Sequence, residues 1–285
     1  MAPGRLIPLT LLLTGAALLP SASCTDVRHV GEVDRPIQVL VWNNALQFGH
    51  ASRIKAIPYL LKRQATDNIN FDIKYARTEI MDGQEDVRDP PSFDASVFSD
   101  AGLDRYDVVF FLHTTGTTID DDLKDTRRQA LRDFIEKKGR GFVGTHSATD
   151  TYQDETWQWY ADFIGANYAT MSPRGGYIAG MLQPVQDHAI LTEAKIPNPW
   201  SLYDEWFTFN RDPIGVKVLL NATDQQTSMV RPSAWVKEIP TNSPGSPTAR
   251  MFYTACCHDS RTFDEDNSRV IDLIVAGIKW AAHRL

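Results

Sequence analysis

The segment Gly141-Phe-Val-Gly-Thr-His-Ser-Ala-Thr-Asp150 decides how this chain folds. Its apolar start predicts a buried strand, and the polar residues that follow predict a turn at the end of that strand. Gly144 and Ala148 flank His146 in the small-x-X-x-small layout of a nucleophile elbow, a sharp strand-to-helix turn that lifts its central side chain above the sheet. The segment therefore predicts that His146 stands at the edge of a sheet.

Strands and helices alternate on both sides of this segment. Apolar or alternating runs predict strands at 37–42, 71–76, 106–112 and 141–144, and apolar residues at helical spacing predict helices over 52–62, 120–138 and 157–164. Pro58 is expected near the first turn of its helix or at a kink in it. Such alternation specifies β-α-β crossovers, so the fold class is α/β, with a mostly parallel sheet and helices on both faces.

The second half of the chain is richer in strands. Further strands are predicted at 177–182, 216–220, 234–239 and 250–254, with a hairpin loop at 240–247 and a final helix over 268–283. The acidic, proline-containing stretch 82–100 is interpreted as a surface excursion. No repeat or break in composition divides the chain, so we expect a lead over 24–36 and a single domain over 37–285.

Residues 1–23 read as an export signal. Arg5 is the one charge, the apolar run over 6–19 is too short to span a membrane, and Ser21 and Ser23 are the small residues that signal peptidase requires. Cleavage would leave Cys24 first, which also fits a bacterial lipoprotein. The prediction is an exported protein of the bacterial periplasm, either lipid-anchored at Cys24 or secreted.

Charge and cysteine content narrow the function classes further. With 29 Lys and Arg against 36 Asp and Glu the net charge is −7, and no basic run exceeds two residues, which argues against nucleic acid as a partner. Three cysteines cannot build a disulfide framework. Cys256 and Cys257 are interpreted as small buried side chains at a strand end, in preference to a strained disulfide or a catalytic thiol.

Four of the seven histidines follow predicted strands. Ligands of open parallel sheets bind beyond the carboxyl ends of the strands, and the loops 43–50, 113–117, 145–150 and 255–259 carry His50, His113, His146 and His258 in that order. We therefore expect these imidazoles to gather at one rim. Their spacing matches no compact metal motif, so a bound divalent metal would need ligands from distant loops, and its ligand set stays unknown.

Carboxylates and aromatic residues complete the candidate site. His146 is the leading general acid or base, and the other candidate catalytic residues are Glu205, Asp150 and His258. Neighbouring residues of a strand point to opposite faces, so Glu205 is assigned to the pocket and Asp204 to a structural hydrogen bond, with a solvated rim pair as the alternative. The candidate substrate-binding residues are His50, His113, Thr114, Asn43, Asp204, Trp206 and Trp42, although each indole could equally serve core packing.

The chain resembles the trehalose-utilisation (ThuA-like) family. The resemblance rests on the segments 107–116 and 141–150, on Asp204-Glu-Trp206, and on Phe252-Tyr-Thr-Ala255 with His258, and it spans nearly all of residues 37–285. It implies a fold of the flavodoxin or class I glutamine amidotransferase type without the elbow cysteine of the latter, and a sugar-related role. His113 departs from the asparagine usual in the family, and Cys256 and Cys257 replace its usual small residues.

Together these observations predict an enzyme that acts on a sugar, glycoside or keto-sugar by acid-base chemistry of histidine and carboxylate groups. It would be a hydrolase, lyase or isomerase without a cysteine nucleophile, and its partner a small carbohydrate. The alternative is a carbohydrate-binding module that uses the same pocket without turnover. A hydrolase with Cys256 or Cys257 as nucleophile is disfavoured, because neither residue lies on a predicted strand-to-helix turn.

Overall fold

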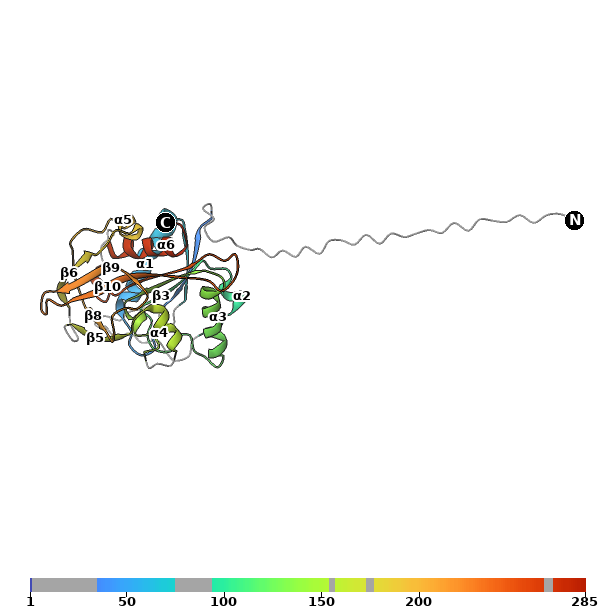
Figure 1. Cartoon of the computed structure of the whole chain (residues 1–285), viewed down its shortest axis with the longest axis horizontal. Coiled ribbons are helices and arrows are strands. Elements are labelled where there is room, and N and C mark those ends of the chain that lie inside the picture. The colour runs from blue at the N-terminus through green and yellow to red at the C-terminus, as the bar shows by residue number, and fades with distance from the viewer. Residues whose placement is uncertain (2–34, 75–93, 154–156, 173–176, 264–268) are drawn as a thin grey trace.

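A nine-stranded mixed sheet runs through the protein in the order β2-β1-β3-β4-β11-β10-β9-β6-β7 (Figure 1). The structure, a computed structural model, describes residue 1 and residues 35–74, 94–153, 157–172, 177–263 and 269–285. The predicted signal 1–23 with Cys24, most of the lead 24–36 and residues 82–93 of the surface excursion lie outside these residues. No helix among the described residues is both long enough and apolar enough to cross a membrane.

The first half of the sheet is parallel. Its strands are β2 (Ile69–Lys74), β1 (Ile37–Trp42), β3 (Val108–Leu112), β4 (Gly141–Thr145) and β11 (Ala249–Thr254). The helices between and after them are α1 (Ala51–Asp67), α2 (Asp100–Leu103), α3 (Lys124–Glu136), the 3-10 helix η1 (His146–Thr149), α4 (Gln158–Ile164) and α6 (Arg269–Ala281). All parallel strands end at one edge of the sheet, where η1 begins.

The second half of the sheet is antiparallel. It consists of β10 (Val230–Ile239), β9 (Lys217–Asp224), β6 (Ile178–Pro184) and β7 (Trp200–Asp204). A separate pair, β5 (Tyr168–Ser172) and β8 (Trp206–Phe209), and the short helices α5 (Ala189–Glu193) and η2 (Ser260–Phe263) complete the chain. The predicted fold class is confirmed, with parallel strands, flanking helices and extra strands in the second half.

Several elements differ from their predicted bounds. Helix α1 continues through Pro58 to Asp67, five residues beyond the predicted end, so the proline neither starts nor ends it. Elements α2, α5, β5, β7 and β8 were not predicted, because each is at most five residues long and carries no full hydrophobic period. The 240–247 loop does join two antiparallel strands, β10 and β11, as predicted.

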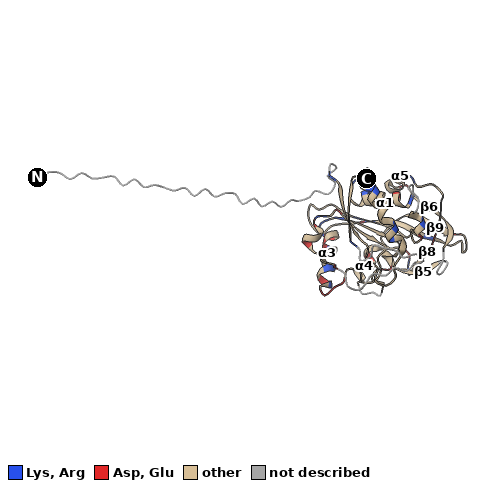
Figure 2. Ribbon diagram, turned by 180° about the vertical axis from the view of Figure 1, so that it is seen from behind, with Lys and Arg blue, Asp and Glu red and all other residues tan. Residues whose placement is uncertain are grey.

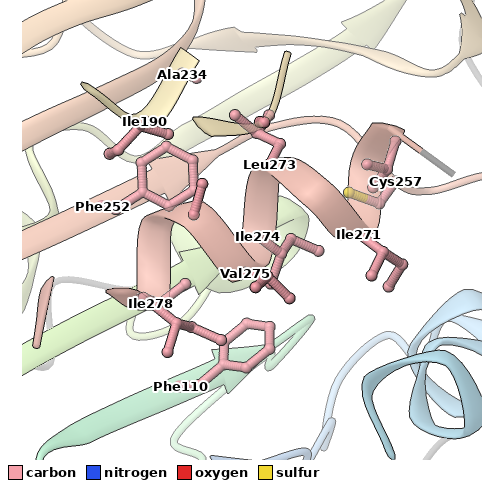
Figure 3. Close-up of a cluster of buried hydrophobic side chains, with 14 of the residues drawn as sticks. Phe110, Ile190, Ala234, Phe252, Cys257, Ile271, Leu273, Ile274, Val275 and Ile278 are labelled. Carbon is pink, nitrogen blue, oxygen red and sulfur yellow. The ribbon is translucent and has the colours of Figure 1, made fainter. Parts of the chain in front are cut away.

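Two hydrophobic cores lie on opposite faces of the sheet. Val39 and Val41 pack on the side of α1, α5 and α6, while Leu40 and Trp42 pack on the side of α2, α3 and α4, as the alternation of a strand requires. Figure 3 shows the apolar residues of α6 against Phe252 of β11. A Cβ on Gly277 would lie 2.1 Å from the Phe252 ring, so α6 approaches the sheet more closely than another residue there would allow.

Charged side chains of both signs lie on the outer helices, and α3 carries them interspersed (Figure 2). Its pairs Arg132–Glu136 and Lys137–Asp133, both with N–O distances of 2.7 Å, link successive turns on the exposed face. Exposed pairs of this kind contribute little to the free energy of unfolding.

The Asp67 carboxylate, by contrast, ties α1 to α6. It lies 2.6 Å from Arg63 Nε and 2.8 Å from Lys279 Nζ. Burial alone raises the pKa of Asp67, but hydrogen bonds from Arg63 and Lys279 outweigh burial and lower the pKa to about 2. The carboxylate therefore stabilises the folded state above pH 3.8, and this contribution is lost as the pH falls toward 2.

We expect Asp67→Asn to lower the free energy of unfolding by at most about 2 kcal/mol near pH 6, because only the ionised carboxylate binds the two cations strongly. Urea unfolding of both proteins at a series of pH values measures the difference, which shrinks steadily below pH 4. The control Asp104→Asn, whose carboxylate is 62% exposed and pairs with Lys138, should stay within about 0.5 kcal/mol at every pH. An Asp67→Asn effect independent of pH would contradict the ion-pair explanation.

Candidate active site

The four strand-end histidines lie together at the carboxyl edge of the parallel strands. His50 is the N-cap of α1, His113 follows β3, His146 follows β4, and His258 follows β11. The ring centroid of His50 lies 4.7 Å from that of His146 and 4.6 Å from that of His258, and His113 lies 5.4 Å from His146. Residues separated by up to 208 positions in the sequence thus form one imidazole cluster.

The backbone at His146 makes the predicted sharp turn. Its φ of +48° lies in the left-handed region, which non-glycine residues adopt only at a cost of order 1 kcal/mol or more. A Cβ on Gly144 would lie 3.1 Å from Cβ of Ala148, so the turn needs small residues at both positions. The ring of Phe207, whose centroid is 4.1 Å away, covers the imidazole. The elbow thus holds a fully buried histidine in one orientation.

Hydrogen bonds define the protonation of this histidine. His146 Nδ1 lies 2.9 Å from the carbonyl oxygen of Ala255, which can only accept, so Nδ1 carries the proton. Nε2 of the neutral ring is therefore an acceptor. It faces Nδ1 of His258 at 3.1 Å and Oε2 of Glu205 at 3.5 Å.

Glu205 and His258 form the closest polar pair of the cluster. Glu205 Oε2 lies 2.6 Å from His258 Nδ1, and the carboxylate can only accept, so His258 donates. One proton on His258 Nδ1 thus lies between two acceptors, the carboxylate and His146 Nε2. The Glu205 side chain is 3% exposed and that of His258 12% exposed, so His258 is the member that connects the pair with solvent.

Burial keeps the inner imidazoles neutral. It is the largest cause that lowers the pKa values of His50, His113 and His146 well below their usual 6.5, and the neighbouring imidazoles lower them further. The guanidinium of Arg53, which is buried in α1, adds to this effect at His50 and His113. At neutral pH the cluster therefore offers lone pairs.

Asp204 fixes the loop that carries His258. Its carboxylate accepts the backbone N–H groups of Cys257 at 2.6 Å, Asp259 at 3.0 Å and Glu205 at 2.9 Å. Burial raises its pKa to about 6, although these bonds act in the opposite direction. The structure thus places Asp204 in loop support and Glu205 in the cluster.

The two adjacent thiols belong to this loop and precede His258. Cys256 and Cys257 are buried, and their Sγ atoms are 3.8 Å apart, too far for a disulfide. Burial raises the pKa of the Cys257 thiol well above its usual value. A thiol held in this protonated state is a poor nucleophile.

Other predicted site residues serve the fold instead. Asn43 Oδ1 accepts from Arg53, and the Thr114 hydroxyl lies 2.7 Å from that of Thr151, so both polar groups have internal partners. Trp42 and Trp206 are only 3% and 2% exposed and belong to the two cores. Their assignment to sugar contacts is corrected, because a buried indole presents no face to a ligand.

Asp150 follows η1 at its C-terminal end and is half-buried. None of the cluster contacts described above involves it. Its role beside His146, which the spacing of four residues suggests, stays a prediction.

An aromatic rim next to His258 was not predicted. The Tyr177 ring centroid lies 5.2 Å from that of His258, and Tyr203 is 49% exposed. The guanidinium of Arg261 lies 5.8 Å and 5.0 Å from the centroids of these two tyrosine rings and pairs with Asp259. The sequence signal was a Tyr beside the Asp204-Glu205 pair, but its orientation depends on how β7 pairs with β6.

Two solved structures share the fold of this chain. Putative ThuA-like proteins from Bacteroides uniformis and Parabacteroides merdae share 18% and 17% sequence identity with the chain, at TM-scores of 0.60 and 0.61. Each alignment covers 87% of this chain, and 92% and 90% of the respective relative. A glutamine amidotransferase from Methylobacillus flagellatus matches at 12% identity and a TM-score of 0.38, covering 78% and 70% of the two chains. No curated protein matches.

The fold and the site define an α/β protein whose elbow carries an imidazole where elbow enzymes carry a nucleophile. The family model described as trehalose utilisation, ThuA, matches residues 38–281. The chain belongs to this family.

Proposed function

We propose that this protein is an exported enzyme that acts on a sugar, glycoside or keto-sugar by acid-base chemistry. The observation that carries the proposal is the position of His258 Nδ1, 2.6 Å from the Glu205 carboxylate and 3.1 Å from His146 Nε2. A buried acceptor joined to a partly exposed imidazole can take a proton from a bound molecule and return it. Glu205 is the proton acceptor, and His258 links it to the ligand.

This assignment changes the role of His146. Its side chain is fully buried, so it supports the pair from below and does not itself meet the ligand. Tyr177 beside His258, with Tyr203 next to it, supports a sugar as ligand, because the C–H face of a pyranose packs on an aromatic ring. The guanidinium of Arg261 next to these rings could bind a hydroxyl or a carbonyl oxygen.

A thermal-shift screen of mono- and disaccharides and their keto derivatives, followed by product analysis of every hit, tests the proposal. A ligand that binds only the folded state raises the unfolding midpoint, and an enzyme also converts it. We expect Tyr177→Ala to raise KM about tenfold or more with kcat little changed, because that ring contacts the ligand and not the proton. Tyr59→Ala is the matched control, because Tyr59 is also half-buried but packs against the core from α1, outside the site.

The non-catalytic carbohydrate-binding module is the competing function. It predicts hits that stabilise the protein without any product, and no effect of Glu205 substitutions beyond affinity. Hits of this kind across the whole panel would favour the binding module over the enzyme.

A further inference from the structure

We propose that His50, His146 and His258 bind a divalent transition-metal ion of the zinc class. One ligand nitrogen from each of the three rings lies within 4.8 Å of the other two. Three points so spaced lie at most about 2.8 Å from a common centre, so shifts of less than about 1 Å bring them to the roughly 2.1 Å of a zinc–nitrogen bond. The inference deepens the proposed function, on which the catalytic use of the ion rests.

The protonation of the cluster favours a cation. His146 Nε2 and Glu205 Oε2 are both acceptors and face each other at 3.5 Å, with only the His258 Nδ1 proton between them. A metal ion bound at His146 Nε2 takes the place of that proton, and the nearby carboxylate, which is not one of the three ligands, balances part of its charge. The carbonyl of Ala255 on Nδ1 of His146 is the kind of outer partner that fixes a ligating imidazole.

A second observation points to the same place. Nε2 of His113 is buried and has no hydrogen-bond partner among the described residues. Its ring lies 5.4 Å from that of His146 and 6.0 Å from that of His50, between centroids. A buried polar atom without a partner is costly, and it marks a place where a ligand or ion is missing its contact.

The donor set selects the class of ion. Neutral imidazoles suit zinc, copper, nickel and iron, whereas magnesium and calcium prefer oxygen ligands. Three histidines leave a coordination position open, as in catalytic zinc sites. An oxygen atom of a sugar that enters beside His258, the partly exposed ligand, could occupy it.

Metal content of the full chain, purified without a histidine tag or chelator, tests this inference. We expect about one equivalent of a transition metal. After dialysis against chelator, titration with Co²⁺ should give saturable visible d–d absorption at one ion per chain and raise the unfolding midpoint. His258→Asn should weaken Co²⁺ binding by more than the roughly 10–100-fold typical of losing an outer partner. His283→Asn, outside the cluster, is the control.

His146→Asn provides a second ligand variant, and circular dichroism checks that each variant folds. Wild-type Co²⁺ affinity in folded His258→Asn would overturn the inference, as would the absence of saturable binding to the wild type. Turnover of a sugar by protein that binds no Co²⁺ would leave the proposed function intact without the ion. Stoichiometric Co²⁺ binding without turnover of any panel member would support the metal site and contradict the proposed enzymatic function.

Discussion

Glu205→Gln is expected to lower kcat by roughly 100- to 10,000-fold, the range of a lost general acid or base. The amide has the shape of the carboxylate, and its oxygen can still accept from His258 Nδ1 at the 2.6 Å seen here. Unlike the carboxylate, the amide cannot take up a proton at neutral pH. The fold and the position of His258 are therefore kept while proton transfer is lost.

Steady-state kinetics on the substrate found in the screen measure this effect, with the unfolding midpoint as a check on folding. Glu238→Gln is the matched control, because Glu238 is an exposed residue of β10 that pairs at 3.2 Å with Arg250, at the end of β11 away from the site. We expect its kcat to equal that of the wild type. A Glu205→Gln protein with wild-type kcat would show that the carboxylate takes no part in the reaction.

Asp204→Asn is expected to destabilise the protein by about 2–4 kcal/mol, as for other losses within a buried polar network. Three backbone N–H groups donate to this carboxylate, at least one to each oxygen. An asparagine can keep one oxygen as acceptor, but its NH₂ group must then face a donor. At Oδ2 that donor is the N–H of Cys257.

Urea unfolding gives the change in stability, and the rate of reaction of Cys256 and Cys257 with a thiol reagent reports the loop. Loss of the hydrogen bond from the Cys257 backbone N–H to residue 204 should expose the thiols and speed their reaction in the folded protein. Asp187→Asn, at an exposed position before α5, should change neither quantity. An Asp204→Asn protein as stable as the wild type would show that the loop is held by other contacts.

The convergence of the four histidines follows from simple rules about parallel sheets. Strands β1, β3, β4 and β11 were recognisable as apolar runs, and parallel neighbours must end at the same edge. The turn at His146 was equally clear, because Gly144 and Ala148 left room for it. Local patterns therefore identified these positions without knowledge of any contact.

The rest of the site depends on pairing that no local pattern encodes. Tyr203 lies beside Tyr177, the neighbour of His258, only because β7 pairs antiparallel with β6, with Tyr203 opposite Ala179. For Trp206 the local pattern points the wrong way. Its polar neighbours suggest a pocket, but its indole packs over Gly180, where a Cβ would lie 2.4 Å from the ring. Register between distant strands decides both outcomes.

The buried thiols of the His258 loop bear on where such chemistry can operate. A site that depends on a thiolate is inactivated when that sulfur is oxidised, and therefore needs a reducing environment. Here imidazoles and a carboxylate occupy the corresponding edge of the sheet, both sulfur atoms of the loop are buried, and burial keeps the Cys257 thiol protonated. Peroxide and molecular oxygen thus find no vulnerable group among those assigned to proton transfer.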